Sequence, residues 1–352
     1  MGKHPKFKTR AIVFTAKEKA ELISNISCPE VDDETVVIQA KISGLSRGTE
    51  TDMYTGNFHG PEYSFPLITG YEPVGRAIFV GKKITHIKEG DLAVGFNLLP
   101  DSYPKSYCSG WGGAVEYAVY NRSSASPLWY SEEFCAGRRV ARVPNSLDEK
   151  DGIFGVLGGV AYHGVQRVGV KRDDKVVIIG LGVIGNCAAQ FCQSLGARVI
   201  AFDLHELRCE IARKCGIRSA VNASKYDIKE IVASYTGGSG ADVVIECSGE
   251  VQNIDLCVDI AGNDGRVHLQ GAYLEPYAMI VQKTLFGKNL SMSSSCGATP
   301  HHIDQVFQQM VNKQLVVRPM ITHILPVKDV QKGYQLNLHN PDKSLKIGFL
   351  WK

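Results

Sequence analysis

The chain has 352 residues, of which 44% are hydrophobic and 21% charged, and its formal net charge is +3. The composition is typical of a soluble globular protein of two domains, and the small charge argues against nucleic acid as a partner. No apolar stretch is long enough to span a membrane, and the N-terminus lacks the apolar segment of a signal peptide, so we expect a cytoplasmic protein.

Up to about residue 150 the pattern predicts β-strands. Apolar or alternating runs at 11–14, 35–42 and 75–80 are separated by turn sequences. From about residue 153 strands alternate with helices, which is typical of a parallel sheet. The strands expected there are 176–179, 198–203, 241–246, 266–270 and 290–293, and the helices are 158–168, 206–215, 253–260 and 300–313. A strand, a helix near 327–338 and a final strand complete the chain to residue 351.

The ten cysteines are spaced neither as a disulfide framework nor as a zinc site, because none form a C-x-x-C pair and no cysteine–histidine cluster has zinc-finger spacing. A free thiol inside an apolar segment behaves as a small hydrophobic side chain. Six cysteines lie in such segments: Cys187, Cys192, Cys209, Cys215, Cys247 and Cys257. We therefore expect reduced core cysteines.

A Gly-x-Gly-x-x-Gly turn follows the strand 176–179 and opens a helix of small residues. Gly180 allows the tight turn, Gly182 lets the backbone approach a pyrophosphate, and Gly185 lets the helix pack close to the strand. The start of the helix, at Val183 and Ile184, offers backbone N–H groups and a positive dipole end to phosphates. In this context the triplet predicts a dinucleotide site.

Asp203 ends the next strand, where a carboxylate can accept both ribose hydroxyls and would repel a 2′-phosphate. This acid favours NAD over NADP. Arg208, five residues further on, leaves NADP open, since an arginine there can meet a phosphate.

The order of a β-rich part, a nucleotide-binding part and a returning segment resembles the medium-chain dehydrogenase/reductase superfamily. The resemblance rests on the sequences at 44–50, 70–75, 90–91, 112–117 and 159–162 and on the glycine triplet. It implies an α/β fold with a GroES-like catalytic domain (1–152), a Rossmann domain with a parallel sheet (153–298) and a return segment that completes the catalytic domain (299–352). It also implies an active site in the cleft between the domains, and a homodimer joined through the segment 277–293.

In the zinc alcohol dehydrogenases of that superfamily the catalytic metal takes a cysteine, a histidine and a third ligand that comes just before the nucleotide domain. The matching positions here hold Ser46, Tyr71 and approximately Val156, which cannot make a tight zinc site. The four-cysteine structural zinc lobe is also absent, with only Cys108 in its region. We therefore expect a zinc-free enzyme. Its Gly-Leu-Ser-Arg-Gly-Thr-Glu, Gly-Tyr-Glu and Ala-Tyr-His-Gly-Val-Gln-Arg-Val-Gly sequences resemble the branch that includes bacteriochlorophyllide a dehydrogenase.

Without a metal, carbonyl reduction needs hydrogen-bond donors and a general acid at the developing alkoxide. Tyr71 is our first candidate for this donor, and the alternative is a phenol that fills the vacated metal space. Ser46 and Thr49 either bond the substrate oxygen or relay a proton, or are turn hydroxyls that cap local backbone. Glu72 is either a buried base or, more in keeping with its position, a partner for a cation such as Arg47.

Two histidines are weaker candidates. His163, on the helix that enters the nucleotide domain, is either a proton donor or a packed histidine, and His59 lies in a loop that could border the substrate. The aromatic and glycine-rich loops 54–65 and 103–111 are compatible with a roomy, partly apolar pocket for a bulky substrate.

Further cofactor contacts are implied by the resemblance. Arg47 matches a position where relatives often place a cation on the pyrophosphate. Strand ends, where ligands bind in such sheets, add Cys247 and Ser248 near the adenine ribose, and Leu269, Gly271 and Ser294 near the nicotinamide carboxamide. Ordinary strand-end turns would use the same residue types.

Three functions are open from the sequence. The first is hydride transfer between NAD(H) and a secondary alcohol or ketone without zinc. The second is NADPH-dependent reduction of an activated C=C bond, which Asp203 disfavours. The third is a non-catalytic NAD-binding protein.

Overall fold

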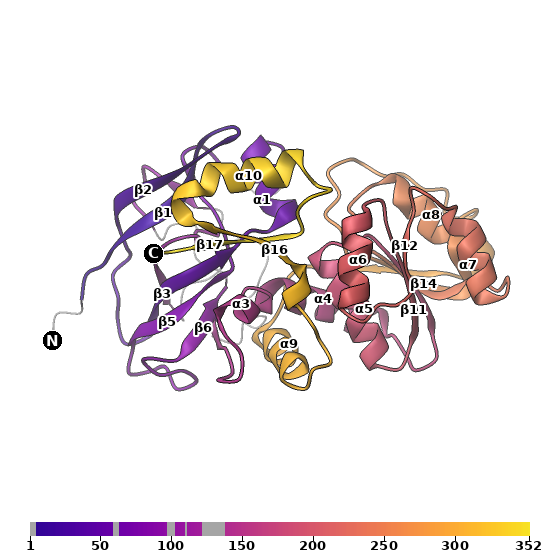
Figure 1. Ribbon diagram of the computed structural model, residues 1–352, viewed down its shortest axis with the longest axis horizontal. Helices are drawn as coiled ribbons and strands as arrows, with labels where there is room; N and C mark the ends of the chain where they lie inside the picture. The colour runs from indigo at the N-terminus through magenta and orange to yellow at the C-terminus, as the bar shows by residue number, and fades with distance from the viewer. Residues whose placement is uncertain (1–4, 59–62, 97–102, 110, 122–137) are drawn as a thin grey trace. The chain divides into compact units, whose positions relative to one another are not determined.

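The computed structural model describes residues 5–58, 63–96, 103–109, 111–121 and 138–352, and Figure 1 shows the path of the chain. Contacts divide it into two compact units. The first contains Met1–Val156, Ala298–Val311 and Ile321–Lys352, and the second contains Leu157–Gly297 and Asn312–Met320. Residues 312–320, which the sequence placed in the return segment, thus belong with the second unit.

The first unit is built from two sheets. The smaller has the order β2-β1-β4-β7, and the larger has the order β16-β17-β3-β5-β6-β9, with β8 also paired to β3. Their bounds are β1 Lys8–Ala16, β2 Lys19–Ser27, β3 Thr35–Gly44, β4 Leu67–Ile68, β5 Pro73–Val80, β6 Leu92–Gly95, β7 Cys108–Ser109, β8 Tyr117–Asn121, β9 Val140–Arg142, β16 Ile321–Pro326 and β17 Lys346–Leu350. Because β17 pairs antiparallel with β3, the last strand of the chain completes a sheet begun near residue 35.

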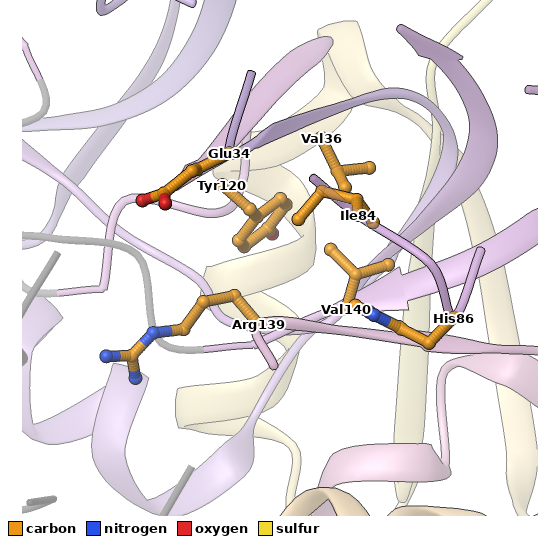
Figure 2. A pocket seen from close by; sticks show the side chains of 7 residues that line it. All are labelled: Glu34, Val36, Ile84, His86, Tyr120, Arg139 and Val140. Carbon is orange, nitrogen blue, oxygen red and sulfur yellow. The ribbon is translucent and has the colours of Figure 1, made fainter. Parts of the chain in front are cut away.

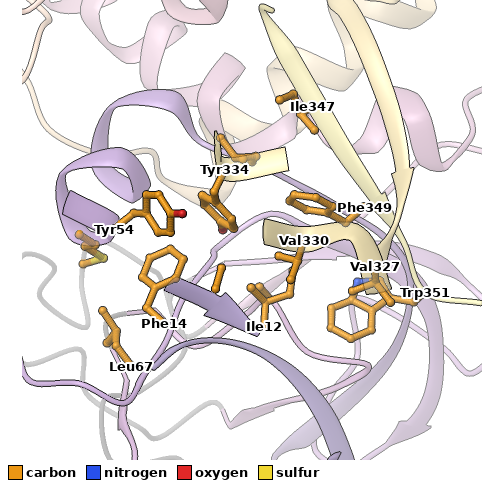
Figure 3. Packing of buried hydrophobic residues seen from close by; sticks show 14 of the residues in the cluster. Ile12, Phe14, Tyr54, Leu67, Val327, Val330, Tyr334, Ile347, Phe349 and Trp351 are labelled. Atoms are coloured by element: carbon orange, nitrogen blue, oxygen red, sulfur yellow. The ribbon is translucent and has the colours of Figure 1, made fainter. Parts of the chain in front are cut away.

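Four α-helices in the described part of the first unit accompany these sheets: α1 Arg47–Thr55, α3 Glu149–Gly152, α9 Pro300–Val311 and α10 Val330–His339. The helix α10 comes from the return segment and packs against α1 from the N-terminal part. Figure 3 shows the aromatic centre of this contact, where Phe14 and Tyr334 meet edge to face at 4.8 Å and Tyr54 stacks on Tyr334 at 5.2 Å. Burial of these rings stabilises the packing of α1 against α10, because each fully buried aromatic side chain contributes about 1.5–3 kcal/mol to the free energy of folding.

The second unit contains a parallel sheet of six strands in the order β12-β11-β10-β13-β14-β15. The strands are β10 Lys175–Ile179, β11 Arg198–Asp203, β12 Ala220–Asn222, β13 Ala241–Glu246, β14 Ala261–Leu269 and β15 Ser291–Ser294. Its helices are α4 Gly155–Val168, which begins in the first unit, α5 Val183–Ser194, α6 Glu206–Lys214, α7 Ile228–Thr236 and α8 Gln252–Ile260. Within this unit α5 and α6 lie on one face of the sheet and α7 and α8 on the other, as right-handed crossovers require (Figure 1).

The strand order reverses at β10, and in such sheets dinucleotides bind beyond the carboxyl ends of the strands next to this point. The expected α/β class, with a GroES-like part and a Rossmann-type sheet, is confirmed. The sequence did not predict α1, β2 or α7.

Among the described residues, no helix combines the length and the apolar character needed to cross a membrane.

Candidate active site

The hydroxyl groups of Tyr71 and Ser46 form a hydrogen bond, in which the phenol donates to Ser46 Oγ. Ser46 is the N-cap residue of α1, but its side chain makes no capping bond, so its hydroxyl is available to Tyr71. The side chain of Thr49, in the first turn of α1, faces the phenol and acts to lower the pKa of Tyr71. Three residues that the sequence proposed for the chemistry are therefore brought together.

Tyr71 is held as a neutral phenol. Burial raises its pKa, and the negative charge of Glu72 raises it further. Its ring meets Trp111 at 5.4 Å, and Trp111 in turn meets Phe58 at 5.9 Å. The phenol thus has an aromatic wall on one side and hydroxyl partners on the other, which suits a hydrogen-bond donor rather than a nucleophile. His59 lies outside the described residues.

Glu72 forms an ion pair with Lys346 of β17, and both side chains are fully buried. Lys346 also donates to the carbonyl oxygen of Leu45 at 3.2 Å. A Cβ atom on Gly44 would meet both charged groups within 3 Å, so glycine is required beside the pair. Of the two readings of Glu72, the arrangement matches a carboxylate that ties down a cation, with Lys346 in the place where Arg47 was expected.

The sequence analysis missed Glu50, a second buried carboxyl group beside the hydroxyl pair. Glu50 is 1% exposed, its Oε1 lies 3.4 Å from the amide nitrogen of Ser46, and its Oε2 accepts a hydrogen bond from Tyr334. Burial, aided by the charge of Glu72, raises the pKa of Glu50 to about 7. The motif at 44–50 ends with this residue but does not identify it as part of the site, because its partner Tyr334 is far away in the sequence.

Arg47 and His163 complete the set of proposed residues. Arg47 is the first residue of α1, directly after Ser46. His163 lies on α4 in the second unit, partly buried, with its Nδ1 3.1 Å from the carbonyl oxygen of Gly297. This contact fits the packed-histidine interpretation.

The glycine turn of the second unit has the expected geometry. Gly180 has φ +93°, a conformation that favours glycine, and a Cβ on Gly185 would lie 1.9 Å from the carbonyl oxygen of Gly180. Gly182 is the N-cap of α5 and has open space where a Cβ would point. The turn is therefore closed by Gly185 and left open at Gly182, on the side where a phosphate would meet the helix N-terminus.

Asp203 is largely occupied within the protein. Its Oδ2 accepts from the amide of Leu181 at 2.8 Å and from Arg208 at 3.3 Å, and its Oδ1 accepts from the amide of His205 at 2.9 Å. A carboxylate has about four acceptor positions, so these bonds leave one for a ribose hydroxyl, not the two expected from the sequence. Arg208 is held on the same carboxylate, which gives it a role other than free phosphate binding.

Glu246, also missed by the sequence analysis, organises the end of β13. Its fully buried carboxylate accepts from the amides of Ser248 at 2.8 Å and Gly249 at 3.1 Å, and from the hydroxyl of Tyr273 at 2.6 Å. Ser248 itself is exposed and follows Cys247 at the strand end. The carboxylate therefore fixes the turn that presents these two predicted cofactor residues.

His268 links the ends of β14 and β15. Its ring is fully buried, with Nδ1 2.9 Å from Ser293 Oγ and Nε2 3.1 Å from both Gln270 Oε1 and Ser295 Oγ. Burial lowers the pKa of His268 to about 4, so the ring is neutral at pH 7. The predicted residues Leu269, Gly271 and Ser294 lie at the ends of the strands that this network joins.

The residues at the superfamily's metal position do not fit zinc. Ser46 and Tyr71 offer a serine hydroxyl and a phenol, and Val156 offers no ligand atom, whereas a tight zinc site requires thiolate or imidazole. Among the described residues, no group of three His, Cys, Asp or Glu side chains could hold a metal ion.

A separate small pocket lies in the first unit and contains none of the proposed site residues. Figure 2 shows its lining, which is Glu34, Val36, Ile84, His86, Tyr120, Arg139 and Val140. It mixes apolar and polar side chains around the buried Tyr120.

Comparison with known proteins agrees with the fold, but one matching family carries the description zinc-binding dehydrogenase, which does not support the expected absence of zinc. Residues 32–129 match the family described as alcohol dehydrogenase GroES-like domain, and residues 183–312 match the family described as zinc-binding dehydrogenase. The chain belongs to the medium-chain dehydrogenase/reductase superfamily. The protein is therefore an oxidoreductase of the medium-chain dehydrogenase type.

Its relatives are distant but of full length. L-threonine 3-dehydrogenase of Bacillus licheniformis is 26% identical over 342 residues, 93% of this chain and 95% of that protein. Sorbitol dehydrogenase of Halalkalibacterium halodurans is 24% identical over 326 residues, 91% of each chain. The crystal structure of 2R,3R-butanediol dehydrogenase from Bacillus subtilis has a TM-score of 0.79 at 19% identity, covering 98% of this chain and 100% of that one, which supports the fold alone.

Proposed function

We propose that this medium-chain dehydrogenase transfers a hydride between NAD(H) and a bulky secondary alcohol or ketone without zinc. The observation that carries the proposal is the hydrogen bond between the hydroxyl groups of Tyr71 and Ser46. The sequence resemblance matches these two residues to metal ligands of the superfamily. Hydroxyl donors aimed at a developing oxyanion can supply the stabilisation that a metal would otherwise give.

The residues of the second unit suit a dinucleotide. Gly182 leaves space at the N-terminus of α5 for a pyrophosphate, and Asp203 retains one acceptor position for a ribose hydroxyl. Bound there, NADH supplies the hydride. The negative charge of Asp203 disfavours a 2′-phosphate, which supports NAD over NADP.

In the proposed reduction the Tyr71 hydroxyl turns its proton from Ser46 to the substrate carbonyl oxygen and gives it up as the alkoxide forms. Ser46 and Thr49 hold the phenol oxygen in position. Trp111 and Phe58 form the aromatic wall beside the phenol and favour an apolar substituent on the substrate. Membership of the bacteriochlorophyllide-type branch and a cytoplasmic location stay predictions.

The first test is a metal and cofactor measurement on purified protein. We expect no stoichiometric zinc by elemental analysis and a larger thermal shift with NADH than with NADPH. We then expect Tyr71→Phe to lower kcat for ketone reduction by about 10²–10³-fold while the Kd for NADH is unchanged. A matched control is Tyr63→Phe, on the same aromatic cluster. Stoichiometric zinc, or a Tyr71→Phe variant with full activity, would contradict the proposal.

Two alternatives are separated by the same experiments. A preference for NADPH, with turnover of enones but not of ketones, would favour reduction of an activated C=C bond. Tight NADH binding without turnover of either class would favour a non-catalytic NAD-binding protein.

We also propose a homodimer formed along β15, which is the edge strand of the sheet. The preceding segment exposes large apolar side chains, Ile280 (62%), Val281 (57%) and Phe286 (70%). Exposed edges and apolar patches are often covered by a partner. A monomeric mass by light scattering would contradict this assembly.

A further inference from the structure

Glu50 is a buried acid that the proposed reaction does not yet use. It lies one helical turn after Ser46 on α1, and its Oε1 faces the amide of that residue at 3.4 Å. The side chain of the same Ser46 accepts the hydrogen bond of Tyr71. One residue therefore connects the acid with the phenol.

The polar and charged groups that act on Glu50 come from several elements. Tyr334 of α10 donates to it, Lys346 of β17 attracts it, and Glu72 repels it. The only cation of this group, Lys346, contacts Glu72 and not Glu50. Lys346 thus pairs with one of the two buried carboxyl groups, and the hydrogen bonds to Glu50 come from neutral donors.

Burial of a carboxylate without a contacting cation favours the protonated form. This is the cause of the raised pKa of Glu50, about 7, and the charge of Glu72 acts in the same direction. The Tyr334 hydrogen bond acts against it, because the phenol stabilises the ionised carboxylate.

Resting on the proposed function, we propose that Glu50 is a positioning residue whose protonated carboxyl group sustains proton donation by Tyr71 during ketone reduction. When Tyr71 gives its proton to the alkoxide, a negative charge forms on the phenol oxygen. A charged Glu50 adds a second uncompensated negative charge to the same buried cluster, and this opposes the transfer.

The balance of the step is that of an ordinary ketone reduction. The carbonyl carbon accepts the hydride from NADH, the carbonyl oxygen accepts the proton of Tyr71, and Tyr71 is reprotonated from solvent after the alcohol leaves. Glu50 keeps its own proton throughout and acts through charge.

The test is the pH dependence of single-turnover ketone reduction by the NADH-loaded enzyme. We expect the wild-type rate to fall on the order of tenfold as the pH rises through about 7, since a tenfold change requires only a small change in the barrier. Glu50→Gln, which is neutral at every pH, is expected to remove this decrease. Tyr334→Phe, which removes a donor to the ionised form, is expected to move the decrease to higher pH.

Asp52→Asn provides the matched control, because it neutralises another acid on α1 and is expected to keep the wild-type pH profile. A Glu50→Gln enzyme with the wild-type pH profile would overturn the inference, even if its rate were lower. If Glu50→Gln does not fold, an unshifted profile in Tyr334→Phe would overturn it. Absence of ketone turnover by the wild-type protein would instead remove the proposed function on which the inference rests.

Discussion

The ammonium group of Lys346 contacts the carboxylate of Glu72, and neither side chain has any exposure to solvent. These residues lie 274 positions apart in the sequence. The pair joins the loop before β5 to β17, and Lys346 also donates to the carbonyl oxygen of Leu45, which precedes α1. Because Leu45 and Glu72 are the chain neighbours of Ser46 and Tyr71, the ion pair holds the backbone of both hydroxyl residues in place.

Removal of one partner of this ion pair should be strongly destabilising. We expect Lys346→Met to lower the free energy of unfolding by about 3–5 kcal/mol, because Glu72 is left as a buried charge without a counter-charge. The double variant Glu72→Leu/Lys346→Met should recover most of that loss. Urea denaturation followed by tryptophan fluorescence measures both.

Lys83→Met is the control for this experiment, since it removes a largely exposed ion pair with Glu34. Its effect should stay below about 1 kcal/mol. A loss of similar size in the two lysine variants would contradict the importance assigned to burial.

Two glycines of the dinucleotide turn should separate folding from binding. Gly185→Ala should destabilise the second unit, because the new Cβ would lie 1.9 Å from the Gly180 carbonyl oxygen. Gly182→Ala should leave the melting temperature within a few degrees of wild type and weaken NADH binding, because its Cβ enters space that is open only without a pyrophosphate. Thermal unfolding and NADH titration check both variants. Unchanged NADH affinity in Gly182→Ala would show that the pyrophosphate lies elsewhere.

Asp203 should determine the choice of cofactor together with Arg208. Replacement of Asp203 by Ser removes the negative charge and releases Arg208 from its 3.3 Å contact. We expect NADPH affinity to rise by about tenfold and NADH affinity to fall by a similar factor, which corresponds to about 1.4 kcal/mol in each case. The double variant Asp203→Ser/Arg208→Ala should lose the gain in NADPH affinity, and its retention would exclude Arg208 as the phosphate partner.

Because His268 is buried as a neutral ring, we expect the free energy of unfolding to decrease in acid. Its folded-state pKa is about 4, below the ordinary value of 6.5, so protonation favours the unfolded chain. The stabilising effect of the neutral ring is full above about pH 7 and is lost as the pH falls from about 6.5 to about 4. It amounts to about 3 kcal/mol.

Urea denaturation at pH 7 and pH 4.5 measures this effect. His268→Gln should show a smaller decrease in stability between the two pH values than wild type, whereas the exposed His339→Gln should behave as wild type. Equal decreases in wild type and His268→Gln would assign the acid sensitivity to other groups.

The accuracy of the sequence-based predictions follows the distance between interacting residues. Asp203 was predictable because its hydrogen-bond donors, Leu181, His205 and Arg208, lie close in the sequence. The glycine turn was predictable from its own spacing, and the strand bounds 198–203 and 241–246 agree with the structure. The helix α1 was missed because its sequence, Arg-Gly-Thr-Glu-Thr-Asp-Met-Tyr-Thr, has no clear apolar stripe, and packing against α10 stabilises it instead.

The catalytic surroundings were predicted only in part for the same reason. Tyr71 and Ser46 were identified from motifs, but the hydrogen bond between them was not predicted. Glu50 ends the motif at 44–50 but was not proposed for the site, since its partner Tyr334 lies 284 residues away. Nothing in the sequence distinguishes Lys346 from other strand lysines, and only the fold shows that it pairs with Glu72.

The pairing of β17 with β3 also constrains the order in which the molecule matures during translation. The second unit is complete, apart from residues 312–320, once residue 297 has been made. The first unit, in contrast, waits for residues 346–350 before β3 pairs with β17 and Glu72 gains its counter-charge. We therefore expect the nucleotide-binding part to become protease-resistant on the ribosome first, while the segment that carries Tyr71 is still open to chaperones.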